Sequence, residues 1–141
     1  MKEISIEEAK LRGVEMVNTE MDNGEIRYRI VSDDGSSYAR TVATEDSEWQ
    51  NSHVHHQHQE MYVVQKGWVI LAELIDHKLV QTRYKAGDYF LSKIDIPHNM
   101  YLSAGSVTHA VKFGVGEYSD WEAVPELDDL IFEEVEYRDL W

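Results

Sequence analysis

The 141-residue chain has no cysteine, only two prolines and few basic residues. Without cysteine it can form no disulfide, hold no iron–sulfur cluster or thiolate-bound zinc, and use no thiol nucleophile. Any metal must therefore be bound by histidine, carboxylate or carbonyl groups. The 13 Lys and Arg residues stand against 27 Asp and Glu residues, which gives a net charge of -14. This charge repels phosphate backbones and anionic lipid surfaces, so we expect no nucleic acid and no membrane as a partner.

Long apolar segments are missing as well. The longest uncharged apolar run, Trp68–Ala72, is far shorter than the roughly 20 residues that span a bilayer. Acidic side chains occupy the first ten residues, where a signal peptide has an apolar stretch. We therefore expect a soluble, cytoplasmic protein. The length is that of one domain with one core, and we predict a single domain over residues 1–141.

Turn-forming residues recur about every ten positions and separate short β-rich runs. The predicted strands are Glu25–Val31, Ser37–Ala43, Met61–Gln65, Trp68–Ile75, Leu79–Tyr84, Tyr89–Ser92, His98–Ser103 and Val107–Phe113. This spacing is typical of an all-β sandwich or barrel. Ser5 and Glu8 form a capping-box pattern, which predicts a short helix over residues 5–12.

The last 25 residues form an acidic segment. Residues 117–141 contain ten acidic residues and one basic residue, Arg138, and so carry -9 of the net charge. Hydrophobic side chains are interleaved with these charges, so we expect the segment to pack on its own barrel or on a dimer mate; a tail that docks a partner is the alternative. Pro125 can start a helix that continues through Ile131, with Leu127 and Leu130 on its apolar side.

The stretch HVHHQHQEMYVVQKG concentrates metal-binding side chains. His53 and His55 are two residues apart, so on an extended strand both imidazoles project from one face and can reach one ion. Glu60 follows closely and can bring a carboxylate beside them. His98 opens a later strand, and we expect it to be the fourth ligand.

These residues resemble the two motifs of the cupin superfamily, G-x5-H-x-H-x3,4-E-x6-G and G-x5-P-x-G-x2-H-x3-N. His53, His55, Glu60 and Gly67 match the first motif, and Gly87 and His98 match the second. The remaining motif positions, which are mainly turn and packing positions, are occupied by other residues: Ser47, Lys93, Asp95 and Leu102.

The resemblance implies a double-stranded β-helix, or jelly-roll barrel, over about residues 13–116. It also implies one divalent transition metal, held by His53, His55, Glu60 and His98. A donor set without sulfur suits Fe, Mn, Ni, Co, Cu or Zn. A homodimer is implied because small cupins commonly pair. A solvated polar loop, or a barrel whose site stays empty, is the alternative to a metal site.

Other residues are candidates for chemistry. Strand alternation turns Tyr62 inward after Glu60, and Met100 and Leu102 inward after His98. An inward His109 suits a base beside the metal or a hydrogen-bonded core histidine, and Arg40 suits a partner for a substrate anion or a surface position. Arg27 and Arg29 share a polar strand face that points to a cavity or to solvent.

Two further histidines, His56 and His58, are out of phase with the inward pair or too close to Glu60. We expect them at the surface or at the rim of the barrel.

Three classes of function fit these features. The first is a metal enzyme that acts on a small polar molecule in the barrel mouth, by dioxygenase or by isomerase or lyase chemistry. The second is a non-catalytic barrel that binds or senses a metabolite. The third is an interaction scaffold that uses the acidic C-terminal segment. Fold alone does not choose among them.

Overall fold

The computed structural model describes residues 1–114 and 120–134, and strands predominate within them. The elements in chain order are α1 (Ile6–Leu11), β1 (Val14–Glu20), β2 (Glu25–Ser32), β3 (Ser37–Ala43), β4 (His53–Val54), β5 (Gln59–Lys66), β6 (Trp68–Ile75), β7 (Lys78–Lys85), β8 (Tyr89–Leu91), β9 (His98–Leu102), β10 (Val107–Phe113), β11 (Glu122–Ala123) and α2 (Pro125–Glu134). The predicted strands are all present, with ends that differ by at most two residues.

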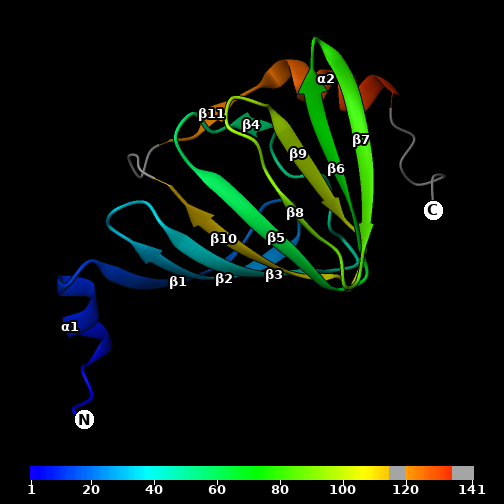
Figure 1. Ribbon diagram of the computed structural model, residues 1–141. Helices are drawn as coiled ribbons and strands as arrows, with labels where there is room; N and C mark the ends of the chain where they lie inside the picture. Colours follow the sequence, from blue (N-terminus) through cyan, green and yellow to red (C-terminus); the bar gives the residue numbers. More distant parts are fainter. Residues whose placement is uncertain (115–119, 135–141) are drawn as a thin grey trace.

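The strands of the described residues form two antiparallel sheets that face one another (Figure 1). One sheet has the order β1-β2-β3-β10-β5-β8 and the other the order β11-β4-β9-β6-β7. Sequence neighbours β5 and β6 lie in different sheets, as do β9 and β10, so the chain repeatedly crosses between the layers. This arrangement confirms the predicted all-β jelly roll.

The main core lies between the sheets. Its buried side chains alternate along the strands and include Tyr62 and Val64 on β5 and Met100 and Leu102 on β9, as the strand period predicts. Strand β6 is buried on both faces, which explains its nearly continuous apolar sequence WVILAELI.

The outer face of β6 is covered by α2. Leu127 and Ile131 are buried there against Ala72 and Leu74 (Figure 1). Leu130 packs at the edge of this cluster, so the predicted apolar side of the helix is correct. The hydrophobic residues beyond Glu134, and Glu117, lie outside the described residues. A single domain over residues 1–141 stays a prediction.

Helix α1 stands at one end of the six-stranded sheet (Figure 1). Ser5 caps it as predicted, since its hydroxyl accepts a hydrogen bond from the Glu8 N–H at 3.0 Å.

Two turns lie at glycine positions of the two sequence motifs, one occupied by glycine and the other by aspartate. Gly67, between β5 and β6, has a φ of 79°, and a Cβ there would collide with the Ser106 hydroxyl. Glycine is therefore required for both conformation and space. Asp95 stands where the second motif has glycine, and it adopts a φ of 64°. Aspartate tolerates this left-handed conformation better than most residues, so the turn before His98 is preserved without glycine.

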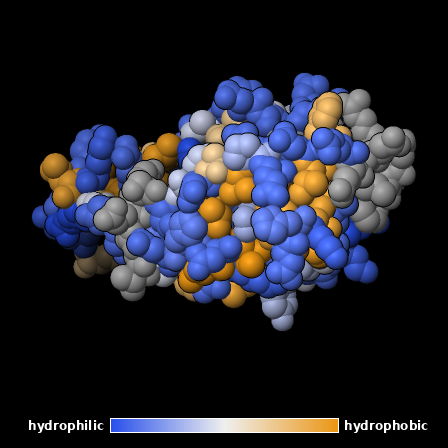
Figure 2. Space-filling model, turned by 90° about the horizontal axis from the view of Figure 1, so that it is seen from above, coloured by the Kyte–Doolittle hydropathy of each residue, from blue (hydrophilic) through white to orange (hydrophobic). Residues whose placement is uncertain are grey.

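Seen from above, hydrophilic side chains cover most of the surface and apolar ones form separate patches (Figure 2). Neither described helix has the length and apolar composition that a membrane crossing needs.

Candidate metal centre

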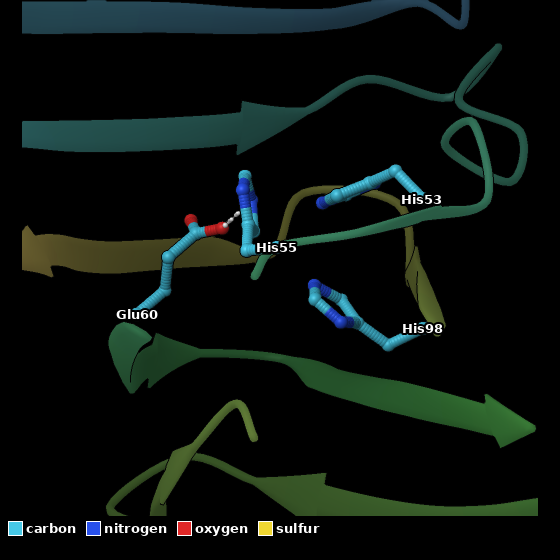
Figure 3. Close-up of side chains that lie close together, drawn as sticks. All are labelled: His53, His55, Glu60 and His98. Carbon is cyan, nitrogen blue, oxygen red and sulfur yellow. Dashed lines mark ion pairs between the residues drawn. The ribbon is translucent and has the colours of Figure 1, made fainter. Parts of the chain in front are cut away.

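Four side chains converge at one end of the space between the sheets (Figure 3). His53 lies on β4, His55 directly follows that strand, Glu60 lies on β5 and His98 lies on β9. His53 and His98 are direct partners in the β4–β9 pairing. One nitrogen or oxygen atom from each of the four residues lies within 4.8 Å of the others. The structure thus brings together all four residues predicted as metal ligands.

The three imidazoles are oriented by backbone carbonyl groups. His53 Nδ1 lies 2.8 Å from the Asn51 carbonyl oxygen, and His98 Nδ1 lies 3.2 Å from that of Ile96. His55 Nδ1 bonds to the Asp120 carbonyl oxygen. Because a carbonyl oxygen only accepts, each Nδ1 carries a hydrogen and each Nε2 is the atom offered to the centre.

Glu60 is held by two donors. His55 Nε2 lies 2.9 Å from Glu60 Oε1, and the Tyr62 hydroxyl donates to Oε2 at 2.7 Å. Burial would raise the pKa of Glu60, but these two hydrogen bonds and the nearby imidazoles lower it to about 2. Burial opposes a charge on His55, yet the bond and charge of Glu60 raise its pKa above the usual value. Without a metal, this shift favours the form of His55 that carries a proton on both nitrogens.

The other two imidazoles are neutral. Burial, reinforced by His98, lowers the pKa of His53 to about 4. Burial likewise lowers the pKa of His98. Unprotonated imidazoles are the form that binds metals.

An orphaned atom tests whether a metal fits here. His98 Nε2 is buried and has no hydrogen-bond partner in the described part of the chain. Buried polar atoms of this kind are rare, and each one needs an explanation. A cation bound by this nitrogen, His53, His55 and Glu60 supplies the missing partner. Three imidazoles and one carboxylate suit a divalent transition metal, so the residues fit the group that the sequence predicts.

Known proteins show a similar fold. No family model matches the sequence, and no curated protein matches it. Solved structures do match. Oxalate decarboxylase from Bacillus subtilis superposes with a TM-score of 0.62 at 11% identity, over 77% of this chain and 30% of that one. An oxalate oxidase with the substrate analogue glycolate gives 0.59 at 20% identity, over 77% and 59%. Inhibitor-bound CapF gives 0.63 at 13% identity, over 76% and 33%.

The chain has the cupin fold. It spans about a third to just over half the length of the first structures that it matches, 30% and 55%.

Three of the four side chains, His53, His55 and Glu60, line a cavity of about 260 Å³. Arg27 and Arg29 from β2 and Lys112 from β10 also line it, so the polar face of β2 points to the cavity and not away from it. Tyr62 lies at its wall, and Trp121 stacks on the His53 ring with 5.6 Å between centroids. Strand alternation places Lys112 on the same face of β10 as Ala110. The sequence prediction takes the opposite face, that of His109, as the inward one, and so misses Lys112.

The same error places His109 on the wrong face, and the structure decides between the two positions left open for Arg40. His109 points away from the cavity, where its ring nitrogens bond to the Tyr38 hydroxyl at 2.7 Å and to Gln65 at 2.6 Å. Arg40 lies on the same outer face, with its guanidinium 5.8 Å from the centre of the Tyr28 ring. The predicted inward orientation of His109 is therefore wrong, and neither residue lines the cavity. Both strands carry polar residues on each face, so their sequences do not set the phase.

The loop from His56 to His58 depends on Asp120, which sequence reasoning missed. The Asp120 carboxylate accepts hydrogen bonds from the backbone N–H groups of His56, Gln57 and His58 at 2.8 to 2.9 Å. Burial would raise its pKa, but these N–H groups lower it strongly.

The two histidines of this loop have different positions. His56 is exposed between Asp95 and Glu122, as predicted. His58 is fully buried, 3.3 Å from Asp120, so its predicted surface position is wrong. The loop reverses the chain, and strand alternation does not apply there.

Proposed function

We propose that the chain is a metal-dependent cupin enzyme that acts on a small polar metabolite in the 260 Å³ cavity. The observation that carries this proposal is the convergence of four donor atoms within 4.8 Å, one of them an orphaned buried nitrogen. One divalent ion bound by His53, His55, Glu60 and His98 explains both.

A metal held by His53, His55, Glu60 and His98 would supply Lewis-acid or redox chemistry to a substrate in the cavity. The chain's own residues prepare the site. Tyr62 fixes the Glu60 carboxylate, and backbone carbonyl groups fix the tautomer of each histidine. Trp121 stacks on one side of the His53 ring and holds its orientation.

The similar structures support an enzyme. They include an oxalate decarboxylase, an oxalate oxidase and hydroxypropylphosphonic acid epoxidase, and one of them, HppE, is in its Fe(II) form. Iron is therefore the first metal to test, ahead of Mn, Ni, Co, Cu and Zn. Dioxygenase chemistry and redox-neutral isomerase or lyase chemistry are both retained.

Metal analysis of protein purified without added metal tests the proposal. We expect about one transition-metal ion per chain, and its loss in His98→Ala. His77→Asn is a matched control, since it removes an exposed imidazole at the β6–β7 turn, and asparagine tolerates the φ of 59° there. Equal metal content in wild type and His98→Ala would refute the ligand set.

Activity assays then separate the kinds of function. Oxygen uptake with small hydroxy and keto acids indicates a dioxygenase, and product formation without oxygen uptake indicates isomerase or lyase chemistry. Tight binding without turnover favours the alternative, a metabolite-binding or sensing cupin.

The remaining predictions concern partners and location. We retain a homodimer, which the exposed apolar side chains on the outer face of β5 and β10 support: Met61, Val63, Val111 and Phe113. Sedimentation equilibrium tests it. A cytoplasmic location, and the exclusion of nucleic acid and membranes by the net charge of -14, stay predictions from the sequence.

A further inference from the structure

The cavity beside the four proposed metal ligands is lined by basic residues, although the chain as a whole is strongly acidic. Arg27, Arg29 and Lys112 line it, and Glu60 is the one acidic residue among its described lining residues. Lysine and arginine are normally exposed or paired with carboxylates. Arg27 has a counterion in Glu25, which lies outside the lining of the cavity. The described residues place no carboxylate in an ion pair with Arg29 or Lys112.

Lys112 lacks such a counterion. Lys112 is directly paired with Glu60 between β10 and β5, so the Cβ atoms of the two residues are close together. However, the two oxygens of Glu60 are occupied by His55 and Tyr62. In the described part of the chain, no hydrogen bond or ion pair is formed by the Lys112 ammonium group. Lys112 lines the same cavity as His55 and Glu60.

Arg27 is anchored from behind. Its Nη2 lies 3.1 Å from Glu25 Oε1, and Glu25 is fully buried. Asn23 and Gln50 also donate to that carboxylate. A guanidinium group has five N–H donors, so a single anchoring bond leaves others for a ligand. Arg29 is similar, because Nη2 donates to Thr19 while its buried Nε has no partner within residues 1–114 and 120–134.

Small side chains leave room between these cations and the cluster. Ala39 is paired with Arg29 on one side and with Ala110 on the other, and Ala110 is paired with Tyr62. Two alanines thus form the floor of the cavity. Its volume of about 260 Å³ lies just below the ~300 to 1,000 Å³ of sites for drug-sized ligands.

We infer that this cavity binds a small organic acid, whose carboxylate groups are held by Lys112 and Arg27 next to the four proposed metal ligands. The inference rests on the proposed metal site and names its substrate class. Arginine and lysine form strong charge-assisted hydrogen bonds with carboxylates, and burial in a small cavity strengthens them. A neutral ligand of the same shape would leave the cations unpaired.

Calorimetric titration of metal-loaded protein with oxalate, malonate and succinate tests the inference. We expect at least one acid to bind, and malonamide, the uncharged analogue of malonate, not to bind. Lys112→Met should weaken acid binding by about 10- to 100-fold, the usual value of a hydrogen bond to a charged group. Lys112→Arg should restore most of it, and Lys85→Met, which removes an exposed lysine from β7, should match wild type.

Lys112→Met is preferred to Arg27→Gln because it leaves no buried carboxylate without its partner. Thermal unfolding and metal content are measured on every variant. If a metal-loaded protein binds none of the three acids, binds malonamide as tightly as malonate, or binds equally well after Lys112→Met, the inference is overturned. Absence of metal from the purified, reloaded protein is a different result. That result contradicts the proposed function. If the metal-free protein still binds an acid, and Lys112→Met weakens this binding, the inference of a cationic site is supported all the same.

Discussion

Asp120→Asn changes a residue that supports the four proposed metal ligands without being one of them. The Asp120 carboxylate is bound by three consecutive backbone N–H groups of the loop between His55 and Glu60. Its carbonyl oxygen accepts from His55 Nδ1. The side chain is 6% exposed, so water cannot readily replace these bonds. Asp120 is thus a positioning residue for two of the four ligands.

The size of the effect follows from the three bonds. An asparagine amide places an NH₂ group where one oxygen was, so at least one backbone N–H faces a donor. The bonds that remain lose the help of the negative charge. Hydrogen bonds to charged groups contribute about 1.5 to 3 kcal/mol each, so we expect a loss of about 2 to 4 kcal/mol in the free energy of unfolding. Changes to such supporting residues typically weaken metal affinity about 10- to 100-fold.

Chelator competition measures the metal affinity, and urea unfolding of the metal-free protein measures stability. Asp95→Asn is the matched control, because Asp95 also bonds to a histidine of this loop, His56, but its side chain is 69% exposed. Asparagine also tolerates its left-handed backbone. We expect the control to change little. A metal affinity in Asp120→Asn within about threefold of that in Asp95→Asn, against the expected tenfold or more, would show that Asp120 does not position the ligands.

Three further predictions address packing, a turn and protons. Leu127→Ala should cost about 2 to 5 kcal/mol in urea unfolding because the side chain is fully buried between α2 and β6, whereas Phe132→Ala, at 90% exposure, should cost less than about 0.5 kcal/mol. Gly67→Ala should cost about 1 to 3 kcal/mol more than Gly87→Ala, since both have positive φ but only Gly67 lacks room for a Cβ. At about pH 6, below the raised pKa of His55, metal binding should release about one proton per ion, so affinity falls as pH falls. Indicator dye in weak buffer measures the proton, and release near zero would contradict the protonated state.

Much of the fold is encoded locally. Turn residues delimit eight of the strands, and the Ser5 cap and Pro125 start the two helices. Strand β1 was not predicted, because none of its residues is buried and its sequence shows no clear alternation of apolar and polar residues. Strands β4 and β11 have two residues each, too short for any periodic pattern.

The part of the site that could be predicted consists of residues with a characteristic spacing in the sequence. His53, His55 and Glu60 lie close together in the sequence, and His98 follows a recognisable turn. Asp120 lies more than sixty residues beyond the loop that it holds, and nothing in its neighbourhood marks it. The positions of Lys112 and His109 depend on the phase of β10, which tertiary packing sets because residues of both kinds occur on each face of the strand.

The net charge of -14 and an acidic ligand are compatible because Glu60 is the one acidic residue among the described residues that line the cavity. Charges on a protein surface are screened over about 8 to 10 Å at physiological salt. Inside the cavity, water is limited and the effective dielectric constant is lower, so nearby charges act more strongly. A ligand there would respond mainly to Arg27, Lys112 and the proposed metal, while distant carboxylates would have little influence. The surface charge therefore argues against extended polyanions and leaves a small acid free to bind.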